Sequence, residues 1–399
     1  MINSKTSNYQ TYLLFFLWTI GLISTIVRLF VGERLDLTPW ILIIVLVDII
    51  INISKRNWKF NYFSYHVSVL ILIFYGWLIF SNAYSPSPSY KFDKTLSFIA
   101  NIIFFIYPFF IKKINFNLLI KLYCLIILPL SAYFVYMNSI VWSIQSAQTA
   151  AFMNIRGSYL IFGIHLGILF LMLLQQNKNI ILKIITFSLL VASGARGPLI
   201  FTILVILIYY IKERKLIVFN PKSMFRVIFV LMGLTGIYFY KRNTINFLLE
   251  NSFSRFGSLA GGDDGSSLER VHRLNFAFHQ PFEDLFTFIF GNGIGSFGIL
   301  FEKIDQRSYP HNILLECFFE LGIIGLILML ILFMLVFKKI SFKENIFGLL
   351  FVFVFLNAMK SSNITDLWIL FGTIGGMASM KEGLATNEIK SKIISQNYQ

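Results

Sequence analysis

The chain has 399 residues, of which 57% are hydrophobic and 45 are phenylalanine, and its mean hydropathy is +0.73. Soluble globular proteins of this length contain far fewer apolar residues, so the composition excludes that class and indicates a polytopic membrane protein. The formal net charge of +15 would suit a nucleic-acid-binding protein, but the basic residues follow the ends of apolar segments, which favours membrane topology as their explanation.

Apolar segments recur along the whole chain at about the 17–25 residues that a helix needs to cross a hydrocarbon layer. The first has no small-residue cleavage site after it, so we expect a retained helix and no signal peptide. We predict an all-α protein with about twelve membrane-spanning helices, at residues 11–31, 37–53, 62–82, 95–111, 118–140, 158–174, 179–193, 198–211, 227–240, 312–337, 344–359 and 366–380.

Basic residues are distributed unequally between the two sets of predicted loops. With a cytoplasmic N-terminus, most lie in inside loops, and the short outside loops contain only Arg34, Lys91, Lys94, Arg156, Arg196 and Lys360. This asymmetry follows the positive-inside rule and predicts both chain ends in the cytoplasm. The predicted organisation is spans one to nine in residues 1–240, a long outside loop over 241–310, three more spans in 311–380 and a cytoplasmic tail over 381–399.

The chain contains two cysteines, Cys124 and Cys317, and both fall within predicted spans. We expect two free, buried thiols, with no disulfide framework and no metal cluster.

The loop over residues 241–310 is far longer than the others, and a loop of this length is usually functional or disordered. It is not of low complexity, and we expect a small extracytoplasmic subdomain lying on the membrane. Seven basic residues lie in it: Lys241, Arg242, Arg255, Arg270, Arg273, Lys303 and Arg307.

Within this loop, the segment from Ser266 to Pro281 has the pattern of an amphipathic helix. Ser266 and Glu269 fit a capping box, and Pro281 ends the pattern. An apolar stripe is expected at Leu268, Val271, Leu274 and Phe278, with Arg270 and Arg273 on a different face. Such a helix could rest on lipid or on the helix bundle and present its arginines to a ligand, or it could bind anionic headgroups as a basic interfacial helix.

The sequence GNGIGSFG at residues 291–298 contains the spacing G-x-G-x-x-G. A dinucleotide site would need a strand before it and a helix after it, and neither is indicated here. We therefore expect a flexible turn that lets the backbone approach a ligand or the bundle.

The sequence SGARGP at residues 193–198 places Arg196 among small residues between two predicted spans, with Pro198 suited to the start of the second. A charged side chain so close to the membrane usually has a partner, or it extends to the lipid phosphates.

His311 follows Pro310 directly and precedes an apolar span, so it lies at a helix N-terminus, where anions are favoured. Glu316 and Glu320 follow within that helix, one turn apart, and helical-wheel angles direct them away from His311. We expect these two glutamates to support the loop or a neighbouring helix.

These motifs occur in the order SGARGP, then SSLER and GNGIGSF in the long loop, then PHNILLE with ELG at the start of the next span. Residues 193–325 thereby resemble the O-antigen polymerase and O-antigen ligase superfamily of bacterial inner membranes. The pattern P-H-N-x-x-L-E…L-G after such a loop is fairly specific, whereas the glycine turn alone is weak. One departure is Ala195, where the family often has serine.

The resemblance implies a glycosyltransferase of the GT-C type that uses sugars carried on undecaprenyl pyrophosphate at the periplasmic face, is inverting, and needs no metal or cofactor. It implies that Arg196, Arg270 and His311 are catalytic. Guanidinium groups suit a pyrophosphate leaving group, and a histidine with a pKa near neutrality suits deprotonation of the acceptor hydroxyl. Arg255, Arg273, Arg307 and Asn312 are expected to contact the substrate.

Polymerase and ligase share this architecture and differ in the acceptor, which is another lipid-linked repeat unit or the lipid A core; we favour the polymerase. A lipid-linked oligosaccharide flippase is the alternative from another class, but transporters commonly contain internal repeats, which are not evident here. The expected partners are the lipid-linked substrate, membrane lipids, a chain-length regulator and a flippase, and no nucleic acid.

Overall fold

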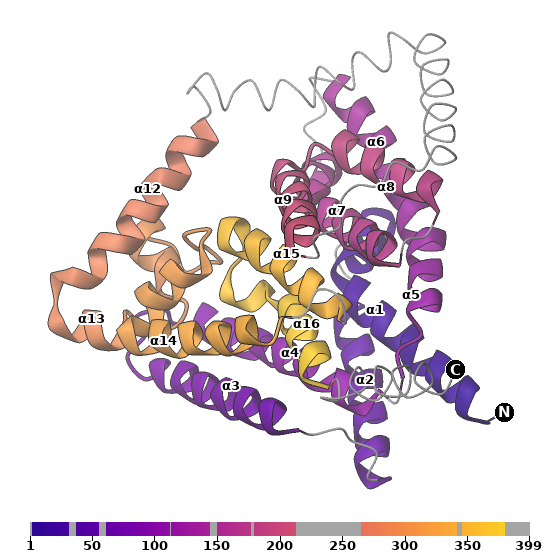
Figure 1. Cartoon of the computed structure of the whole chain (residues 1–399). Coiled ribbons are helices and arrows are strands. Elements are labelled where there is room, and N and C mark those ends of the chain that lie inside the picture. The colour runs from indigo at the N-terminus through magenta and orange to yellow at the C-terminus, as the bar shows by residue number, and fades with distance from the viewer. Residues whose placement is uncertain are drawn as a thin grey trace.

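The computed structural model describes residues 2–31, 37–55, 61–111, 113–143, 150–176, 179–212, 265–340 and 345–379. Over these residues the regular secondary structure is entirely helical (Figure 1). The first half contains α1 (Ile2–Val31), α2 (Thr38–Ser54), α3 (Tyr62–Ser81), α4 (Tyr90–Phe110), α5 (Phe116–Leu122), the π-helix η1 (Tyr123–Ile127), α6 (Leu128–Ser143), α7 (Ala150–Gln175), α8 (Ile180–Ala192) and α9 (Arg196–Lys212). The second half contains α12 (Gly265–His279), η2 (Gln280–Glu283), α13 (Leu285–Phe290), η3 (Gly298–Glu302), α14 (Ile313–Lys338), α15 (Ile346–Ser361), η4 (Ile364–Asp366) and α16 (Trp368–Ser379).

Five helical segments are long and apolar enough to cross a membrane: Asn8–Val27, Tyr62–Ser81, Tyr90–Phe110, Phe116–Met137 and Ile313–Lys338. Shorter apolar helices accompany them. Every predicted span except 227–240 coincides with a described helix, and 227–240 lies outside the described residues. The described residues are thus all helical, as predicted, and five helices have the length and composition that a membrane-spanning protein requires.

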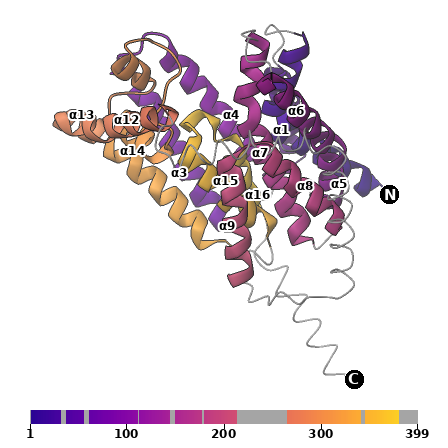
Figure 2. The same ribbon diagram turned by 90° about the horizontal axis from the view of Figure 1, so that it is seen from above.

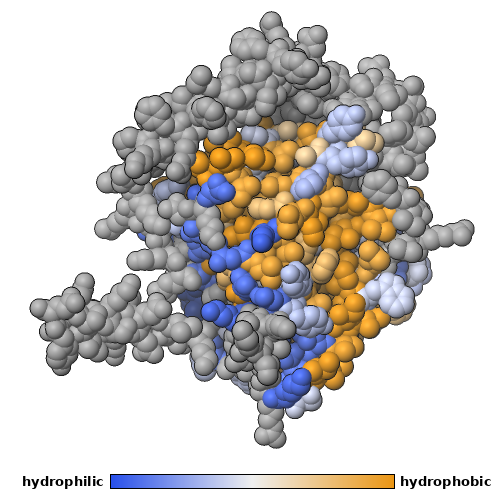
Figure 3. All heavy atoms as spheres, turned by 90° about the vertical axis from the view of Figure 1, so that its right-hand side faces the viewer, coloured by the Kyte–Doolittle hydropathy of each residue, from blue (hydrophilic) through white to orange (hydrophobic). Residues whose placement is uncertain are grey.

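Large apolar side chains cover the outer surface of the helices. Ile211 is 76% exposed and Leu125 is 65% exposed, values that suit contact with lipid. The face seen in Figure 3, which is the right-hand side of Figure 1, is mostly hydrophobic over its described residues and has hydrophilic residues along one margin. Both cysteines are free thiols, as predicted; Cys317 is buried as expected, whereas Cys124 is only partly buried.

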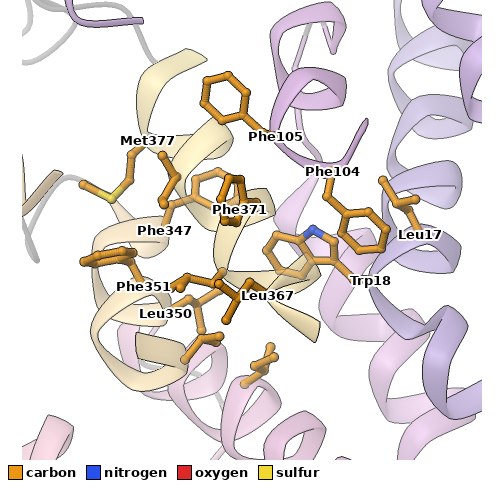
Figure 4. Close-up of a cluster of buried hydrophobic side chains, with 14 of the residues drawn as sticks. Leu17, Trp18, Phe104, Phe105, Phe347, Leu350, Phe351, Leu367, Phe371 and Met377 are labelled. Carbon is orange, nitrogen blue, oxygen red and sulfur yellow. The ribbon is translucent and has the colours of Figure 1, made fainter. Parts of the chain in front are cut away.

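The centre of the molecule is an aromatic core between α1, α4, α15 and α16 (Figure 4). Trp18 of α1 packs edge to face on Phe347 of α15, with ring centroids 5.8 Å apart. A Cβ atom on Gly375 of α16 would lie 2.0 Å from the carbonyl oxygen of Phe105 in α4. Such small residues let helix backbones approach closely, which is how helices gain packing energy when lipid surrounds them.

Helix α14 is broken at Gly322, whose backbone is non-helical (φ 67°, ψ −168°). The carbonyl oxygens exposed by the break have partners: Phe319 accepts from Asn292 N, Glu320 from Gly293 N, and Leu321 from Trp77 Nε1, each at 2.9 Å. Unpaired carbonyls inside a membrane are costly, so the partners stabilise the break.

Two of those three partners belong to the glycine-rich turn, which approaches the bundle. A Cβ atom on Gly293 (φ +85°) would lie 2.5 Å from Cα of Ser85 in the α3–α4 connection. On the same connection, Ser85 Oγ donates to the carbonyl oxygen of Ile294 at 2.6 Å. The glycines are thus required by close backbone contact with α14 and the α3–α4 connection.

Helix α12 coincides with the helix predicted from Ser266, and the face that packs in protein is not the apolar stripe, which leaves the lipid alternative open for the stripe. Leu268 and Val271 are 59% and 51% exposed, whereas Phe276 and Ala277 pack with Phe297 and Phe319. Figures 1 and 2 place α15 between α12 and α9.

Lys94 was predicted in an outside loop, and this was wrong. Helix α4 begins at Tyr90, five residues before the predicted span, and Lys94 is 1% exposed inside it. Hydropathy averages penalise a lysine, so they place the start of a helix after it even when an acidic partner from a distant helix makes its burial possible.

Candidate functional site

His311 lies immediately before α14 with a left-handed backbone (φ +62°). The next residue, Asn312, caps α14: its side-chain oxygen accepts hydrogen bonds from the backbone N–H groups of Leu314 at 3.0 Å and Leu315 at 3.1 Å. The imidazole packs edge to face on Tyr309, with ring centroids 4.6 Å apart. Such a strained backbone is retained where the surroundings fix it, as they often do at functional sites.

The imidazole of His311 is half-buried, and its Nδ1 atom is buried without a hydrogen-bond partner among the described residues. Burial, then the positive charges of Arg270 and Arg273, lower its pKa to about 4, against weaker opposing effects of Glu269 and the backbone of Ser361. The sequence-based expectation was a pKa near neutrality. Burial is the main reason for the difference, and the two arginine charges add to it; both effects favour the neutral imidazole.

Arg273 holds α12 against the segment that leads to His311. Its guanidinium donates to Glu302 at 2.6 Å, to Ser308 Oγ at 2.7 Å and to Glu269 at 2.7 Å. Each of the three guanidinium nitrogens of Arg273 therefore donates a hydrogen bond to a protein group. Glu269 forms an ion pair with Arg273; the capping box expected between Glu269 and Ser266 involves a side chain outside the described residues.

Arg270 lies one turn before Arg273 on α12 and is half-buried. Its charge acts on both His311 and Lys360. Among the ion pairs of the described residues, Arg273 is bound to Glu269 and Glu302, whereas Arg270 has no acidic partner.

Arg196 is the first residue of α9, after a turn that Gly194 makes possible with φ +69°. Lys360, near the end of α15, packs against this start: a Cβ atom on Gly197 would lie 3.4 Å from Lys360 Nζ. The positive charges of Arg270 and Arg196 also act on the ammonium group of Lys360. The N-terminus of α9 adds backbone N–H groups, which favour anions.

The three residues predicted as catalytic are related through two neighbours. Arg196 begins α9, Arg270 lies on α12 and His311 precedes α14. Lys360 is influenced by the charges of Arg196 and Arg270, and His311 is influenced by the charge of Arg270. Sequence reasoning did not select Lys360, although it was one of the few basic residues assigned to the short outside loops. Converging cations of this kind are suited to bind a multiply charged anion such as a diphosphate.

The remaining residues predicted to bind substrate have other contacts. Arg307 pairs with Asp366, and its guanidinium lies 5.9 Å from the ring centre of Tyr309. The side-chain oxygen of Asn312 is engaged in the cap of α14. Arg255 lies outside the described residues.

Asp305 fixes the segment before His311 to the first turn of α4. Its carboxylate accepts hydrogen bonds from Ser87 Oγ at 2.5 Å, from Ser89 N at 2.8 Å and Oγ at 2.7 Å, and from Tyr90 N at 3.3 Å. Although burial opposes it, these hydrogen bonds lower the pKa of Asp305 to about 2. The position of His311 thus depends on Asp305, which anchors the segment before it, and on Asn312, which caps α14 after it.

Glu316 and Glu320 both bind Lys94 of α4, and all three side chains are fully buried. Lys94 Nζ lies 2.8 Å from each oxygen of Glu320 and also donates to Glu316. The partner could not be found by sequence spacing, because 222 residues separate Lys94 from Glu316.

Within the described residues, no three His, Cys, Asp or Glu side chains are grouped as a metal site would require. No family model matches the chain, and no curated protein matches it significantly.

Proposed function

We propose that the chain is a membrane glycosyltransferase that polymerises surface polysaccharide from undecaprenyl-pyrophosphate-linked repeat units. The single observation that supports this most strongly is the linked set of positive charges at the site: Lys360 is influenced by Arg196 and Arg270, and Arg270 also acts on His311. The proposal also includes a GT-C-like arrangement of about twelve spans in a bacterial inner membrane, with the site on the periplasmic side.

In the proposed reaction, the acceptor hydroxyl oxygen attacks the anomeric carbon of the donor sugar. The bond between that carbon and the diphosphate oxygen breaks, and its electron pair leaves with the lipid diphosphate. His311 takes the proton of the attacking hydroxyl, which its neutral imidazole is able to accept. Attack from the face opposite the leaving group inverts the anomeric configuration.

The cations stabilise the leaving group. Arg196 and Arg270 are suited to bidentate contact with phosphate oxygens, and Lys360 supplies a further charge beside Arg196. Since the diphosphate gains negative charge as the glycosidic bond breaks, these contacts strengthen in the transition state, which is the condition for lowering the barrier.

A purified-protein assay tests this function. The protein is incubated with undecaprenyl-pyrophosphate-linked repeat units, with and without a chelator, and the glycan length is measured. We expect chains longer than one repeat from the wild type with or without chelator, and single repeats from His311→Ala. Unchanged polymerisation by purified His311→Ala would disprove the assignment of the base.

Deletion of the gene separates the polymerase from the ligase that shares its architecture. Surface polysaccharide limited to one repeat unit indicates loss of a polymerase. Loss of all attached polysaccharide indicates loss of a ligase. The acceptor of the reaction would then be the lipid A core and not a second lipid-linked repeat unit.

A further inference from the structure

The fully buried cluster of Lys94, Glu316 and Glu320 lies in α4 and α14, two helices with the length and composition of membrane spans. Charges are costly to bury in such helices, and an apolar set of the same volume would often be as stable. The cluster therefore requires an explanation beyond packing, which its hydrogen bonds provide.

Glu316 uses its two carboxylate oxygens for different purposes. Oε1 accepts from Lys94, while Oε2 accepts from the backbone N–H of Ile364 at 2.8 Å. The carbonyl oxygen of the same residue, Ile364, accepts from Asn101 Nδ2 at 2.9 Å. Since Lys94 and Asn101 are two turns apart on one face of α4, Ile364 is held from α14 and α4 together.

Ile364 lies in the short connection between α15 and α16, and this connection contacts the surroundings of His311 on both sides of Ile364. Three residues before it, the backbone of Ser361 acts on the His311 ring. Two residues after it, Asp366 pairs with Arg307, which lies over the Tyr309 ring. Tyr309 in turn packs edge to face on His311.

We propose that Glu316 is a positioning residue for His311, held in its orientation by Lys94. By fixing Ile364, it sets the place of Ser361, whose backbone acts on the imidazole, and of Asp366, which reaches the imidazole through Arg307 and Tyr309. This inference rests on the proposed function of His311 as the base. A carboxylate serves here because it binds an ammonium group and a backbone N–H at once, which an apolar side chain cannot do.

Glu320 provides a matched control. Glu316 and Glu320 are both fully buried acids of α14 bound to Lys94, but the bond to Ile364 is made by Glu316. We compare Glu316→Leu, Glu316→Gln and Glu320→Gln. Glu316→Gln retains an oxygen that can accept from Ile364 N–H, so it should keep part of the activity that Glu316→Leu loses.

Three readouts are measured on full-length protein in detergent: the melting temperature, kcat and KM for the lipid-linked donor, and the rate at which diethyl pyrocarbonate modifies His311. The exposed His279 is the internal standard for modification. We expect Glu316→Leu to lower kcat by about 100-fold, the loss typical of a misplaced catalytic group, with KM changed less than about threefold. The modification rate of His311 should change while that of His279 does not. Glu320→Gln should keep a kcat and a His311 modification rate close to those of the wild type. For Glu316→Gln, both values should lie between those of the wild type and those of Glu316→Leu.

The proposal is overturned if Glu316→Leu melts earlier but keeps the wild-type kcat per folded molecule and the wild-type modification rate of His311, because the cluster would then serve stability alone. If Glu316→Leu does not fold, Glu316→Gln decides by the same readouts. If the wild type forms no polymer, the proposed function fails, whereas the modification rate of His311 still decides whether Glu316 positions it.

Discussion

Tyr309 and His311 pack their rings edge to face, with centroids 4.6 Å apart, although one residue separates them in the chain. The left-handed backbone of His311 brings this contact about. Together with the pair formed by Arg307 and Asp366 on the other side of Tyr309, it gives the imidazole a defined orientation before any substrate binds.

Replacement of His311 should remove the base without unfolding the protein. We expect His311→Gln to lower kcat by about 10²–10⁴-fold, the usual contribution of general-base catalysis, with a small change in KM for the donor. Initial rates with lipid-linked repeat units measure this. His279→Gln, at an exposed position of α12, is the matched control and should keep wild-type activity.

Neutralisation of Arg270 should raise the pKa of His311. Burial is the largest cause of its value of about 4, and the charge of Arg270 comes next. In Arg270→Met the pKa should therefore move upward, toward but not reaching the ordinary 6.5. An NMR titration of histidine-labelled protein, assigned with His311→Gln, measures it. A midpoint that stays at the wild-type pH in Arg270→Met would show that the two residues are not coupled.

His311 should also make folding depend on pH. Its pKa is lower in the folded protein (about 4) than the ordinary 6.5 expected on unfolding, so the unfolded state binds the proton first. The stabilising contribution is complete above about pH 6.5 and is lost as the pH falls from there to about 4. Over this window the melting temperature of the wild type should fall more steeply than that of His311→Gln. Parallel curves would contradict the prediction.

Lys360 should bind the diphosphate of the donor. Removal of its charge in Lys360→Met should raise KM for the donor or lower kcat/KM by about 10-fold, in line with the loss of about 1.4 kcal/mol of charge-assisted binding. High salt should weaken the wild type more than the variant. Lys121→Met, at an exposed lysine of α5, is the control. Equal kcat/KM for Lys360→Met and Lys121→Met would remove Lys360 from the site.

Alanine at Gly322 should destabilise the break in α14. Its φ of +67° is unfavourable for other residues, and a Cβ atom there would lie 2.2 Å from the carbonyl oxygen of Ile289. We expect backbone strain and steric overlap together to lower the free energy of unfolding by more than about 2 kcal/mol, seen as a lower melting temperature. Gly76 in α3 is the control, because a Cβ atom there meets nothing within 4 Å and alanine favours helix. A Gly322→Ala protein as stable as Gly76→Ala would refute this account of the break.

The positions of the apolar helices could be predicted from sequence, because the hydropathy of about twenty consecutive residues decides whether a helix is stable in lipid. Pro310, His311 and the apolar run after them likewise marked a helix start by local rules, and α14 begins at Ile313. The sequence left open whether the apolar stripe of α12 rests on lipid or on the bundle. In the structure Leu268 and Val271 are exposed, and Phe276 and Ala277 pack beside Phe297 and Phe319.

Composition and neighbours within a few turns were enough to predict the helices of the described residues, their long apolar segments, the two free thiols and a set of candidate basic residues. Contacts between distant segments were needed to find that Lys94 is buried with Glu316 and Glu320, that Lys360 is influenced by Arg196 and Arg270, and that the glycine turn binds the broken α14. These contacts join residues far apart in the chain. Their energies come from mutual geometry, through burial, charge pairing and backbone hydrogen bonds, which no local pattern contains.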